Sequence, residues 1–531
     1  MTAQALDRLQ EAASHIAELV AGGTVRTKSE LEKLKKRAAA DFQLDRYPSS
    51  AEILAHVPPA DRDRCAGLLR VHPRRSASGI VVVTAFSAPF SCPHGTCVFC
   101  PGGPRQGTPQ SYLPQSPGMQ SALEARFDSR LQVERSLAKY VANGHAVGKV
   151  EAIIEGGTFI ALPDGYQTEF VKGVYDGLNG TVSGTLSEAQ AANETAASRC
   201  VGLTLESKPD WCRPKDVDLM LRHGITRVEI GVQSLRPEVL LRSNRGHTVE
   251  DSAKAFQVAR DAGLKVTAHM MPGLPGATPE GDLEDLRRIF EDEAFRPDMS
   301  KLYPTLVVPG TALAKQFNAG LYKPYPLETV VELLSDMKGF VPSWHRIMRI
   351  QREIPAAEIE GGVRDGNLRQ LVLQRAREKG ITCRCIRCRE VLLRDPEALG
   401  RDDALAYREV RYNASGGEEV FGSLEFERSG TIAAFVRMRV PSPLAHRGEM
   451  KGGAVVRELR VYGVVVGIGK KEDAAWQHRG LGASLLERME EAASSEFGVR
   501  KLLVISAVGT RGYYRRLGYE REGPYMAKGL R

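Results

Sequence analysis

Three cysteines on one short segment are the residues best suited to chemistry in this 531-residue chain. Cys92, Cys97 and Cys100 follow the apolar run 79–86. Their thiolates can hold three irons of a cubane cluster and leave the fourth iron without a protein ligand. A zinc loop is the alternative, because Cys-x2-Cys is also a zinc spacing. The position of the loop favours the cluster, since a loop that follows the first strand of a βα barrel lies at the carboxyl ends of the strands, where the active sites of such barrels are found.

An iron without a protein ligand predicts another ligand that completes its coordination. The amino and carboxylate groups of S-adenosylmethionine (SAM) can fill that position, and an electron from the cluster then cleaves the sulfonium to a 5′-deoxyadenosyl radical. The spacing departs from the most common radical-SAM pattern, Cys-x3-Cys-x2-Cys, because four residues separate Cys92 from Cys97.

Short β-branched runs alternate with helical stretches from residue 78 onward, which predicts a parallel sheet. Six such units indicate an α/β fold with a partial, TIM-like (βα)6 barrel over residues 78–340. Several strands end in glycines or polar side chains, which we expect to bind SAM, although ordinary polar strand ends are the alternative for any one of them. The expected strands are 80–86, 150–155, 201–206, 227–233, 265–270 and 301–308, and the expected SAM ligands are Gly156, Gly157, Glu206, Gln233 and His269.

A second cysteine group lies in an arginine-rich linker, residues 341–400. Cys383, Cys385 and Cys388 give three soft ligands, so a structural zinc needs a fourth. His345 is the nearest candidate outside the group. A second iron–sulfur cluster is the alternative.

The last segment, residues 401–531, changes character to a mixed α/β pattern. A strand at 458–467 is followed by Gln477-x-x-Gly480-x-Gly482, then a helix, a strand at 501–506, and Tyr513-Tyr514. A glycine loop at a helix N-terminus is suited to bind a pyrophosphate, because free N–H groups and the helix dipole both face it. The order resembles the acyl-CoA site of the GNAT acetyltransferases. The two tyrosines are expected to act as acid or orienting groups, with a packing role in the core as the alternative.

The N-terminal region, residues 1–77, opens with an amphipathic helix and then carries a basic run. Taken alone, such a run is explained by a solvated helix face more often than by a phosphate-binding patch. The net charge of +8 permits an anionic partner without requiring one. The candidate residues are Lys33, Lys35, Lys36, Arg37, Arg74 and Arg75.

Composition limits the class of protein. A hydrophobic content of 42% and a charged content of 26% are typical of globular proteins, and about three domains are expected at this length. The sequence has no apolar run of the roughly 18 residues that a membrane span requires, so we expect a cytoplasmic protein. Six of nine cysteines are clustered, which favours metal over disulfides.

The combination of a radical-SAM-like region and a GNAT-like region resembles the Elongator protein 3 family over nearly the whole chain. That family shares the wider first cysteine gap. The most specific stretches are 97–103, 110–112, 149–159, 231–234, 351–355, 458–463 and 523–526.

The resemblance implies an enzyme that builds a carboxymethyl group at C5 of uridine 34 in the anticodon stem-loop of tRNA. It implies a 4Fe–4S cluster on Cys92, Cys97 and Cys100, SAM, an electron donor and a scaffolding zinc, and it allows a homodimer. Lys149 is also implied in acetyl-CoA binding and catalysis, which requires the CoA to span two domains because this residue begins its strand. The implied acetyl-CoA contacts are Lys149, Glu458, Leu459, Arg460, Val461, Leu481, Gly482, Ala483 and Tyr514.

The chemistry explains why both regions are needed. The C–H bond of an acetyl methyl is too strong for ordinary acid–base removal, but a 5′-deoxyadenosyl radical can take that hydrogen. The carbon radical can then add to C5, and hydrolysis of the thioester leaves a carboxymethyl group. Two other functions compete with this interpretation: a protein lysine acetyltransferase with a structural iron–sulfur domain, and a non-catalytic RNA-binding scaffold.

Overall fold

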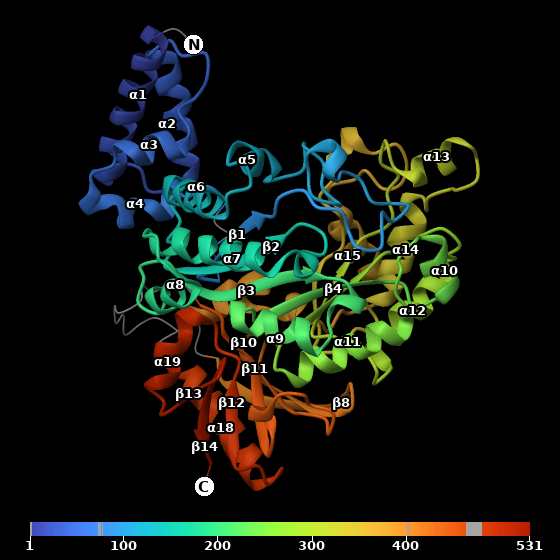
Figure 1. Ribbon diagram of the computed structural model, residues 1–531. Helices are drawn as coiled ribbons and strands as arrows, with labels where there is room; N and C mark the ends of the chain where they lie inside the picture. The colour runs from blue at the N-terminus through green and yellow to red at the C-terminus, as the bar shows by residue number, and fades with distance from the viewer. Residues whose placement is uncertain (1–2, 73–75, 77, 401–402, 464–479, 531) are drawn as a thin grey trace.

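The computed structural model describes the chain except residues 1–2, 73–75, 77, 401–402, 464–479 and 531. It contains a lobe of N-terminal helices, a parallel sheet covered by helices, and a second, mixed sheet (Figure 1). Within the described residues, no helix combines the length and the hydrophobicity that crossing a lipid bilayer requires.

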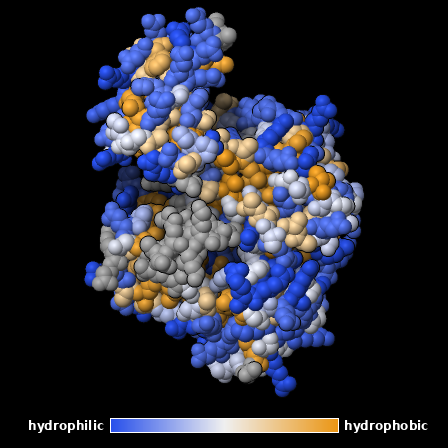
Figure 2. Space-filling model, turned by 90° about the vertical axis from the view of Figure 1, so that its left-hand side faces the viewer, coloured by the Kyte–Doolittle hydropathy of each residue, from blue (hydrophilic) through white to orange (hydrophobic). Residues whose placement is uncertain are grey.

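The N-terminal lobe is built from short amphipathic helices that bury apolar side chains such as Ile16, Leu31 and Ile53 against one another. Two of its helices begin with capping boxes, in which Thr27 and Ser49 accept from the third residue of the helix. The lobe projects from the body of the molecule and has a mainly hydrophilic surface (Figure 2). Its helices are α1 (Ala3–Ala21), α2 (Lys28–Asp41), α3 (Ser50–His56) and α4 (Arg62–Leu69).

The first sheet is entirely parallel, and its strands are ordered β1 to β7 as in the sequence. This open half-barrel confirms the predicted α/β fold, but it has seven strands where the sequence predicted six, because β7 lies in the segment expected to be a linker. The strands are β1 (Val81–Phe86), β2 (Lys149–Glu155), β3 (Arg199–Ser207), β4 (Arg227–Gln233), β5 (Lys265–Met270), β6 (Met299–Leu302) and β7 (Arg346–Arg349).

Side chains of β2 show how the sheet is oriented. Val150, Ala152 and Ile154 are buried in the core that the covering helices form, whereas Lys149, Glu151, Ile153 and Glu155 alternate with them and face the barrel interior. The helices that accompany this sheet are α5 (Met119–Glu124), α6 (Ser129–Ala142), α7 (Asp164–Asn179), α8 (Leu186–Asn193), α9 (Pro214–His223), α10 (Pro237–Arg242), α11 (Val249–Asp261), α12 (Pro279–Glu291), α13 (Ala312–Asn318), α14 (Leu327–Met337), α15 (Leu368–Glu378), α16 (Ile386–Arg389) and α17 (Val391–Arg394).

The second sheet has the order β13-β14-β12-β11-β10-β9-β8. All its pairs are antiparallel except β11 with β12, which are parallel and joined through α18. This agrees with the predicted acetyltransferase-like fold. Its elements are β8 (Leu405–Ala414), β9 (Gly417–Phe426), β10 (Ile432–Val440), β11 (Gly453–Val461), α18 (Leu481–Ser495), β12 (Lys501–Val504), α19 (Arg511–Arg515), β13 (Glu520–Glu522) and β14 (Tyr525–Gly529).

Buried ion pairs join the two sheets. Arg457 of β11 donates to both carboxylate oxygens of Asp298, which precedes β6, at 2.5 and 2.7 Å. Arg439 of β10 pairs with Asp261 at the end of α11 at 2.6 Å. All four side chains are fully buried, so each charge depends on its partner across the interface.

Candidate functional site

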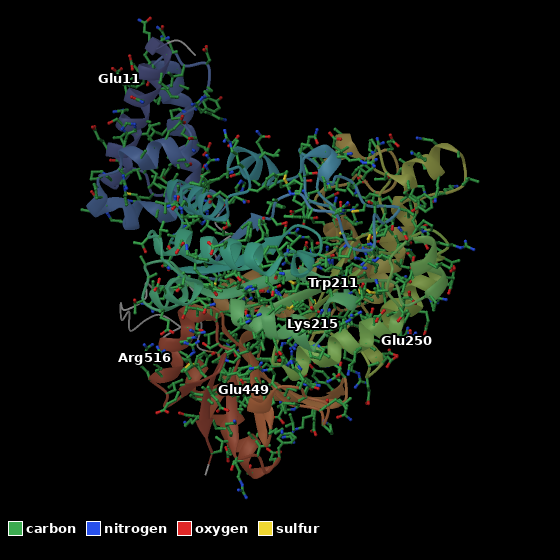
Figure 3. The ribbon with its side chains drawn as sticks, in the orientation of Figure 1. Glu11, Trp211, Lys215, Glu250, Glu449 and Arg516 are labelled. Carbon is green, nitrogen blue, oxygen red and sulfur yellow. The ribbon has the colours of Figure 1, made fainter. Side chains whose placement is uncertain are left out.

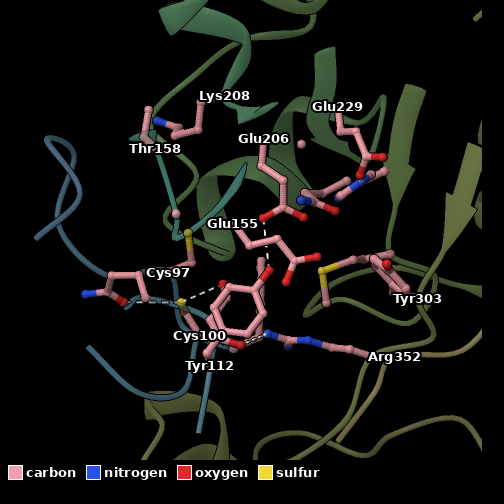
Figure 4. A pocket seen from close by; sticks show the side chains of 18 of the residues that line it. Cys97, Cys100, Tyr112, Glu155, Thr158, Glu206, Lys208, Glu229, Tyr303 and Arg352 are labelled. Carbon is pink, nitrogen blue, oxygen red and sulfur yellow. Dashed lines mark hydrogen bonds and ion pairs between the residues drawn. The ribbon is translucent and has the colours of Figure 1, made fainter. Parts of the chain in front are cut away.

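A cavity opens at the carboxyl ends of the strands of the first sheet (Figure 4). We call it the upper cavity. Its wall combines the loop that follows β1 with residues from the ends of β2 to β7. The residues used below are Cys92, Cys97, Cys100, Tyr112, Glu155, Gly157, Glu206, Glu229, Gln233, Arg245, His269, Lys301 and Tyr303.

All three predicted cluster cysteines lie on the wall of the upper cavity. The buried Arg245 guanidinium donates to Cys97 Sγ at 3.2 Å and to the Gly231 carbonyl at 2.6 Å. Burial, together with the neighbouring Cys97, raises the pKa of the Cys100 thiol to about 11. A bound cation would offset the cost of ionising these thiols. Three thiols in this position are therefore better suited to bind a metal cluster than to exist as free thiolates.

Several buried polar atoms on this wall have no hydrogen-bond partner among the described side chains. They are His94 Nδ1, Glu229 Oε1, Gln233 Oε1 and Arg245 Nε. Buried polar atoms are normally satisfied, so a polar ligand such as SAM fits this wall. A Cβ at Gly157 would stand 3.4 Å from Cys92 Sγ, and φ is +76° there, so glycine keeps the backbone close to the thiol.

The predicted SAM residues come together as expected, apart from one. Gly157, Glu206, Gln233 and His269 line the upper cavity. Gly156 instead lies against Ser87, where a Cβ would stand 2.0 Å from the serine Oγ. Its role is therefore to let β1 and β2 approach closely at their ends.

An ionised carboxylate lies at the base of the upper cavity. Glu229 Oε2 pairs with Lys301 and is 2.9 Å from His269 Nε2. Although burial alone would raise it, the pKa of Glu229 is lowered by Lys301 and His269. The pKa of Lys301 is raised by the same pairing. Glu229 and Lys301 therefore form a stable charged pair.

A second carboxylate in the same cavity behaves differently. Burial, together with the neighbouring Glu155, raises the pKa of Glu206 to about 7. The Tyr112 hydroxyl donates to Glu206 Oε2 at 3.0 Å (Figure 4). Glu206 can therefore exchange a proton near neutral pH, while Glu229 cannot.

A second cavity, of about 540 Å³, opens at the opposite, amino ends of the strands, between the two sheets. We call it the lower cavity. The first residues of β2, β3, β4 and β5 all line it and are basic: Lys149, Arg199, Arg227 and Lys265. Arg516, next to α19 at the edge of the molecule in Figure 3, adds a further cation. This charge suits an anionic ligand.

The residues expected to contact acetyl-CoA mostly meet in the lower cavity. Lys149 lies in it with Glu458, Leu459, Arg460 and Val461 of β11, and Gly480, Gly482, Ala483, Tyr513 and Tyr514 line it as well. The placement of Lys149 at the start of its strand is thereby explained, because the cavity spans both sheets. Gln477 lies outside the described residues.

One predicted residue of this group points elsewhere. Leu481 packs into the apolar clusters beneath α18 and does not line the cavity. The backbone at the neighbouring Gly482 lies close to the Tyr513 hydroxyl. A Cβ at position 482 would stand 2.9 Å from that oxygen, so a glycine is required there. Burial raises the pKa of Tyr513 and of Tyr514, so both phenols are hydrogen-bond donors at neutral pH.

The second cysteine group is assembled without the predicted histidine. The thiols of Cys383, Cys385 and Cys388 lie within 4.8 Å of one another, as a metal site requires. His345 is not part of this group: its Nε2 bonds Ser300 Oγ and its Nδ1 bonds the Pro297 carbonyl, each at 2.8 Å. The ring is held between the first sheet and α12, where it packs on Phe290, so the expectation of a His345 ligand is corrected.

The basic residues of the N-terminal lobe lie on different faces of α2, so only some of them are exposed. Lys33, Lys36 and Arg37 are exposed on α2. Lys35 is buried and bonds Glu32 and Ser50 at 2.9 Å, so it holds α2 to α3 and is not available to a phosphate. Arg74 and Arg75 lie outside the described residues.

Sequence reasoning missed most of the charged residues in both cavities. Glu229 and Arg227 lie inside a strand that is buried on both faces, where a charge is costly unless it is paired. The available signal was charged residues at alternate positions: Lys149, Glu151 and Glu155 in β2, and Arg227 and Glu229 in β4. That alternation marks a face that is polar although it is enclosed.

Comparisons with known proteins cover almost the whole chain. Family models match residues 9–77 (ELP3 N-terminal domain), 89–289 (Radical SAM superfamily) and 297–378 (Radical_SAM C-terminal domain). Elongator complex protein 3 of Danio rerio is 42% identical over 509 residues, covering 94% of this chain and 93% of that protein.

Archaeal proteins are similarly close. A Methanocaldococcus jannaschii protein named tRNA uridine(34) acetyltransferase is 42% identical over 490 residues, covering 91% of each chain. The solved structure of Methanocaldococcus infernus Elp3, which lacks residues 1–46, superposes with a TM-score of 0.74 at 39% identity. It covers 85% of this chain and 100% of that one.

Proposed function

Because the chain belongs to the Elongator complex protein 3 family, we propose that it is a radical SAM enzyme that modifies wobble uridine 34 of tRNA. The modification is the addition of a carboxymethyl group to C5, with acetyl-CoA as the carbon source. The name of the M. jannaschii relative supports the tRNA substrate and an acyltransferase class. The cytoplasm, where tRNA is modified and used, is the expected compartment.

The upper cavity is the proposed site of the radical step. A reduced 4Fe–4S cluster on Cys92, Cys97 and Cys100, supplied with electrons by an external donor, would cleave SAM there to give a 5′-deoxyadenosyl radical. Arg245 holds the Cys97 side chain in place through its hydrogen bond to Sγ. Glu206, when it is ionised, can supply negative charge for the sulfonium of SAM, whereas the charge of Glu229 is balanced by Lys301.

The lower cavity is the proposed acetyl-CoA site. Lys149, Arg199 and Arg516 can pair with the phosphates of CoA, and the N-terminus of α18 begins at Gly480 in the same wall. Tyr513 and Tyr514 can donate hydrogen bonds to the thioester carbonyl, because both phenols stay protonated.

The observation that carries the proposal is the presence of both cavities on one sheet. The reaction needs a radical source and an acyl donor. Here a thiol-lined cavity and a cation-lined cavity lie at the two ends of the same strands. A lysine acetyltransferase would use only the second of these sites.

We further propose the division 1–77, 78–340, 341–400 and 401–531 for the tRNA-binding lobe, the radical SAM domain, the linker and the acetyl-CoA domain. Lys33, Lys36 and Arg37 are the proposed phosphate contacts of the lobe. A zinc ion on the cysteines of the linker would stabilise the fold without entering the reaction. A homodimer is compatible with this organisation.

The test is anaerobic. Cluster-loaded protein is incubated with SAM, a reductant, unmodified tRNA and acetyl-CoA labelled at the methyl carbon, and the digested nucleosides are analysed by mass spectrometry. Label in a carboxymethyl group on uridine 34, absent with Cys97→Ala, is expected. Acetyl-lysine on protein with unlabelled tRNA would refute the proposal and favour a lysine acetyltransferase.

A further inference from the structure

The two cavities are separated by a single layer of side chains in the barrel interior. Strand pairing places Ile153, Thr204, Arg227 and Lys265 in one register across β2, β3, β4 and β5. The next layer toward the carboxyl ends contains Glu206 and Glu229, which are paired in the same way, and Glu155, which is two residues beyond Ile153.

The lining residues show how thin this separation is. The lower cavity reaches Thr204, Arg227 and Lys265, whereas the upper cavity reaches Glu206 and Glu229. Two residues along a strand span about 7 Å. The separation between the two cavities is therefore roughly the height of one layer of side chains.

Arg227 is the main obstacle within this layer. It pairs with Glu151 on the lower side at 2.5 Å, and its Nε is 3.6 Å from Glu229 Oε1 on the upper side. Neither that Nε nor that Oε1 has a hydrogen-bond partner among the described residues. An arginine with a carboxylate above and below can shift between them without losing its countercharge.

Two of the other three members of this layer leave room, and Lys265 is the third. Thr204 is small, and Ile153 faces the interior without joining the buried core that its neighbours Ala152 and Ile154 form. Ile153 is also partly accessible, unlike those neighbours. An apolar side chain exposed inside a barrel is suited to contact a thin, largely apolar chain.

We propose that the barrel interior is the path by which the acyl-pantetheine arm of a CoA thioester in the lower cavity reaches the upper cavity, with Arg227 as the movable partition. The inference rests on the proposed function. Hydrogen abstraction requires the acetyl methyl and the radical carbon to lie within about 3–3.5 Å of each other. The phosphates of CoA stay bound in the lower cavity, so only the acyl-pantetheine arm can reach the upper cavity. A route around the outside of the barrel is the competing explanation.

The experiment is affinity labelling with bromoacetyl-CoA, which needs neither tRNA nor radical chemistry. Two variants of the cluster-loaded protein are compared: Ile153→Cys, above the lower cavity in the Arg227 layer, and Val461→Cys, in the wall of the lower cavity. Alkylation is followed by peptide mass spectrometry, with excess CoA as competitor.

We expect both cysteines to be alkylated in a CoA-sensitive manner, at rates within about tenfold of each other. Labelling of Val461→Cys without Ile153→Cys would overturn the passage while leaving the acetyl-CoA site intact. Labelling of neither would refute the acetyl-CoA site itself, and the passage with it.

The partition is tested separately in the Ile153→Cys background. Arg227→Met keeps the length of the side chain but removes its ion pairs, and it should speed labelling at position 153 by about tenfold relative to labelling of Val461→Cys in the same Arg227→Met background. Thr204→Leu adds volume to the same layer and should slow labelling at position 153, which provides the test if Arg227→Met fails to fold. Equal rates in a folded variant would show that this layer does not control access.

Discussion

The upper and lower cavities are built from the same strands yet differ in charge: glutamates of the upper cavity are balanced by basic residues such as Arg245 and Lys301, whereas the lower cavity is lined mainly by basic residues. At the amino ends stand Lys149, Arg199, Arg227 and Lys265, and toward the carboxyl ends stand Glu155, Glu206 and Glu229. A parallel sheet gathers all its amino ends at one edge, so a basic first residue repeated on successive strands becomes a concentrated cationic site. Strand direction thus separates a strongly cationic cavity from one in which glutamates and basic residues are mixed.

The two ends also differ in what surrounds them. The upper cavity is closed by loops of the first sheet itself, whereas the lower cavity exists only because the second sheet packs against the first. The residues that line the lower cavity therefore also contribute to the stability of the interface between the two domains. The following predictions separate the two ends, from the largest expected effect to the smallest.

Removing one cluster thiol should abolish the function of the upper cavity only. With Cys97→Ala we expect SAM cleavage to 5′-deoxyadenosine to fall below detection, because only two of the three thiols would remain. Acetyl-CoA binding, measured by calorimetry, should not change. The matched control is Cys383→Ala, in the other cysteine group, which should retain SAM cleavage. Loss of cleavage in both variants would contradict the assignment of the two groups.

Breaking an interface ion pair should destabilise the lower end. Arg457→Met leaves Asp298 and Glu419 without a partner they bond at 2.5 and 2.7 Å, so we expect a loss of about 3–5 kcal/mol in the free energy of unfolding. Urea denaturation followed by tryptophan fluorescence measures it, since Trp344 stacks on Tyr412 at the same interface.

The control for that variant is Arg375→Met. This arginine forms an exposed pair with Glu332, which water and salt screen, so little change is expected. A loss from Arg375→Met as large as that from Arg457→Met would show that burial at the interface is not what makes its ion pairs important.

The stability of the upper end should depend on pH through Glu206. Its pKa of about 7 in the folded chain exceeds the ordinary value of 4.5, so between these values the folded state holds a proton that the unfolded state has released. Stability should therefore fall as pH rises from about 5 to about 7, by on the order of 2 kcal/mol. In Glu206→Gln this decrease should be absent when unfolding is measured at several pH values, and an unchanged pH profile would contradict the assignment.

Removing one lower-cavity cation should weaken acetyl-CoA binding alone. For Lys149→Ala we expect the Kd to rise by about tenfold, or about 1.4 kcal/mol, as a phosphate contact is lost. Calorimetry at two salt concentrations measures the change and its electrostatic origin. Lys208→Ala removes a lysine of the upper cavity and should leave this Kd unchanged. An equal loss in both variants would show that the two cavities do not bind separate ligands.

Much of the site was determined by local sequence. The cysteine loop after β1, the alternation of strands and helices, and the glycine loop before α18 are each encoded within a few residues, because strand propensity, turn geometry and helix termini are local properties. The residues expected at both ligand sites therefore lie close to where the sequence placed them, including Gly157, Glu206 and Tyr514.

Only the tertiary structure decided which side chains meet. His345 is close to the second cysteine group in sequence order, yet packing fixes both of its ring nitrogens between the first sheet and α12. Lys35 belongs to a basic run, but the position of α3 buries it. The approach of the two cavities at Arg227 depends on strand register and on the docking of the second sheet. These are long-range relations that no local pattern contains, because they depend on which surfaces of distant segments become neighbours when the chain folds.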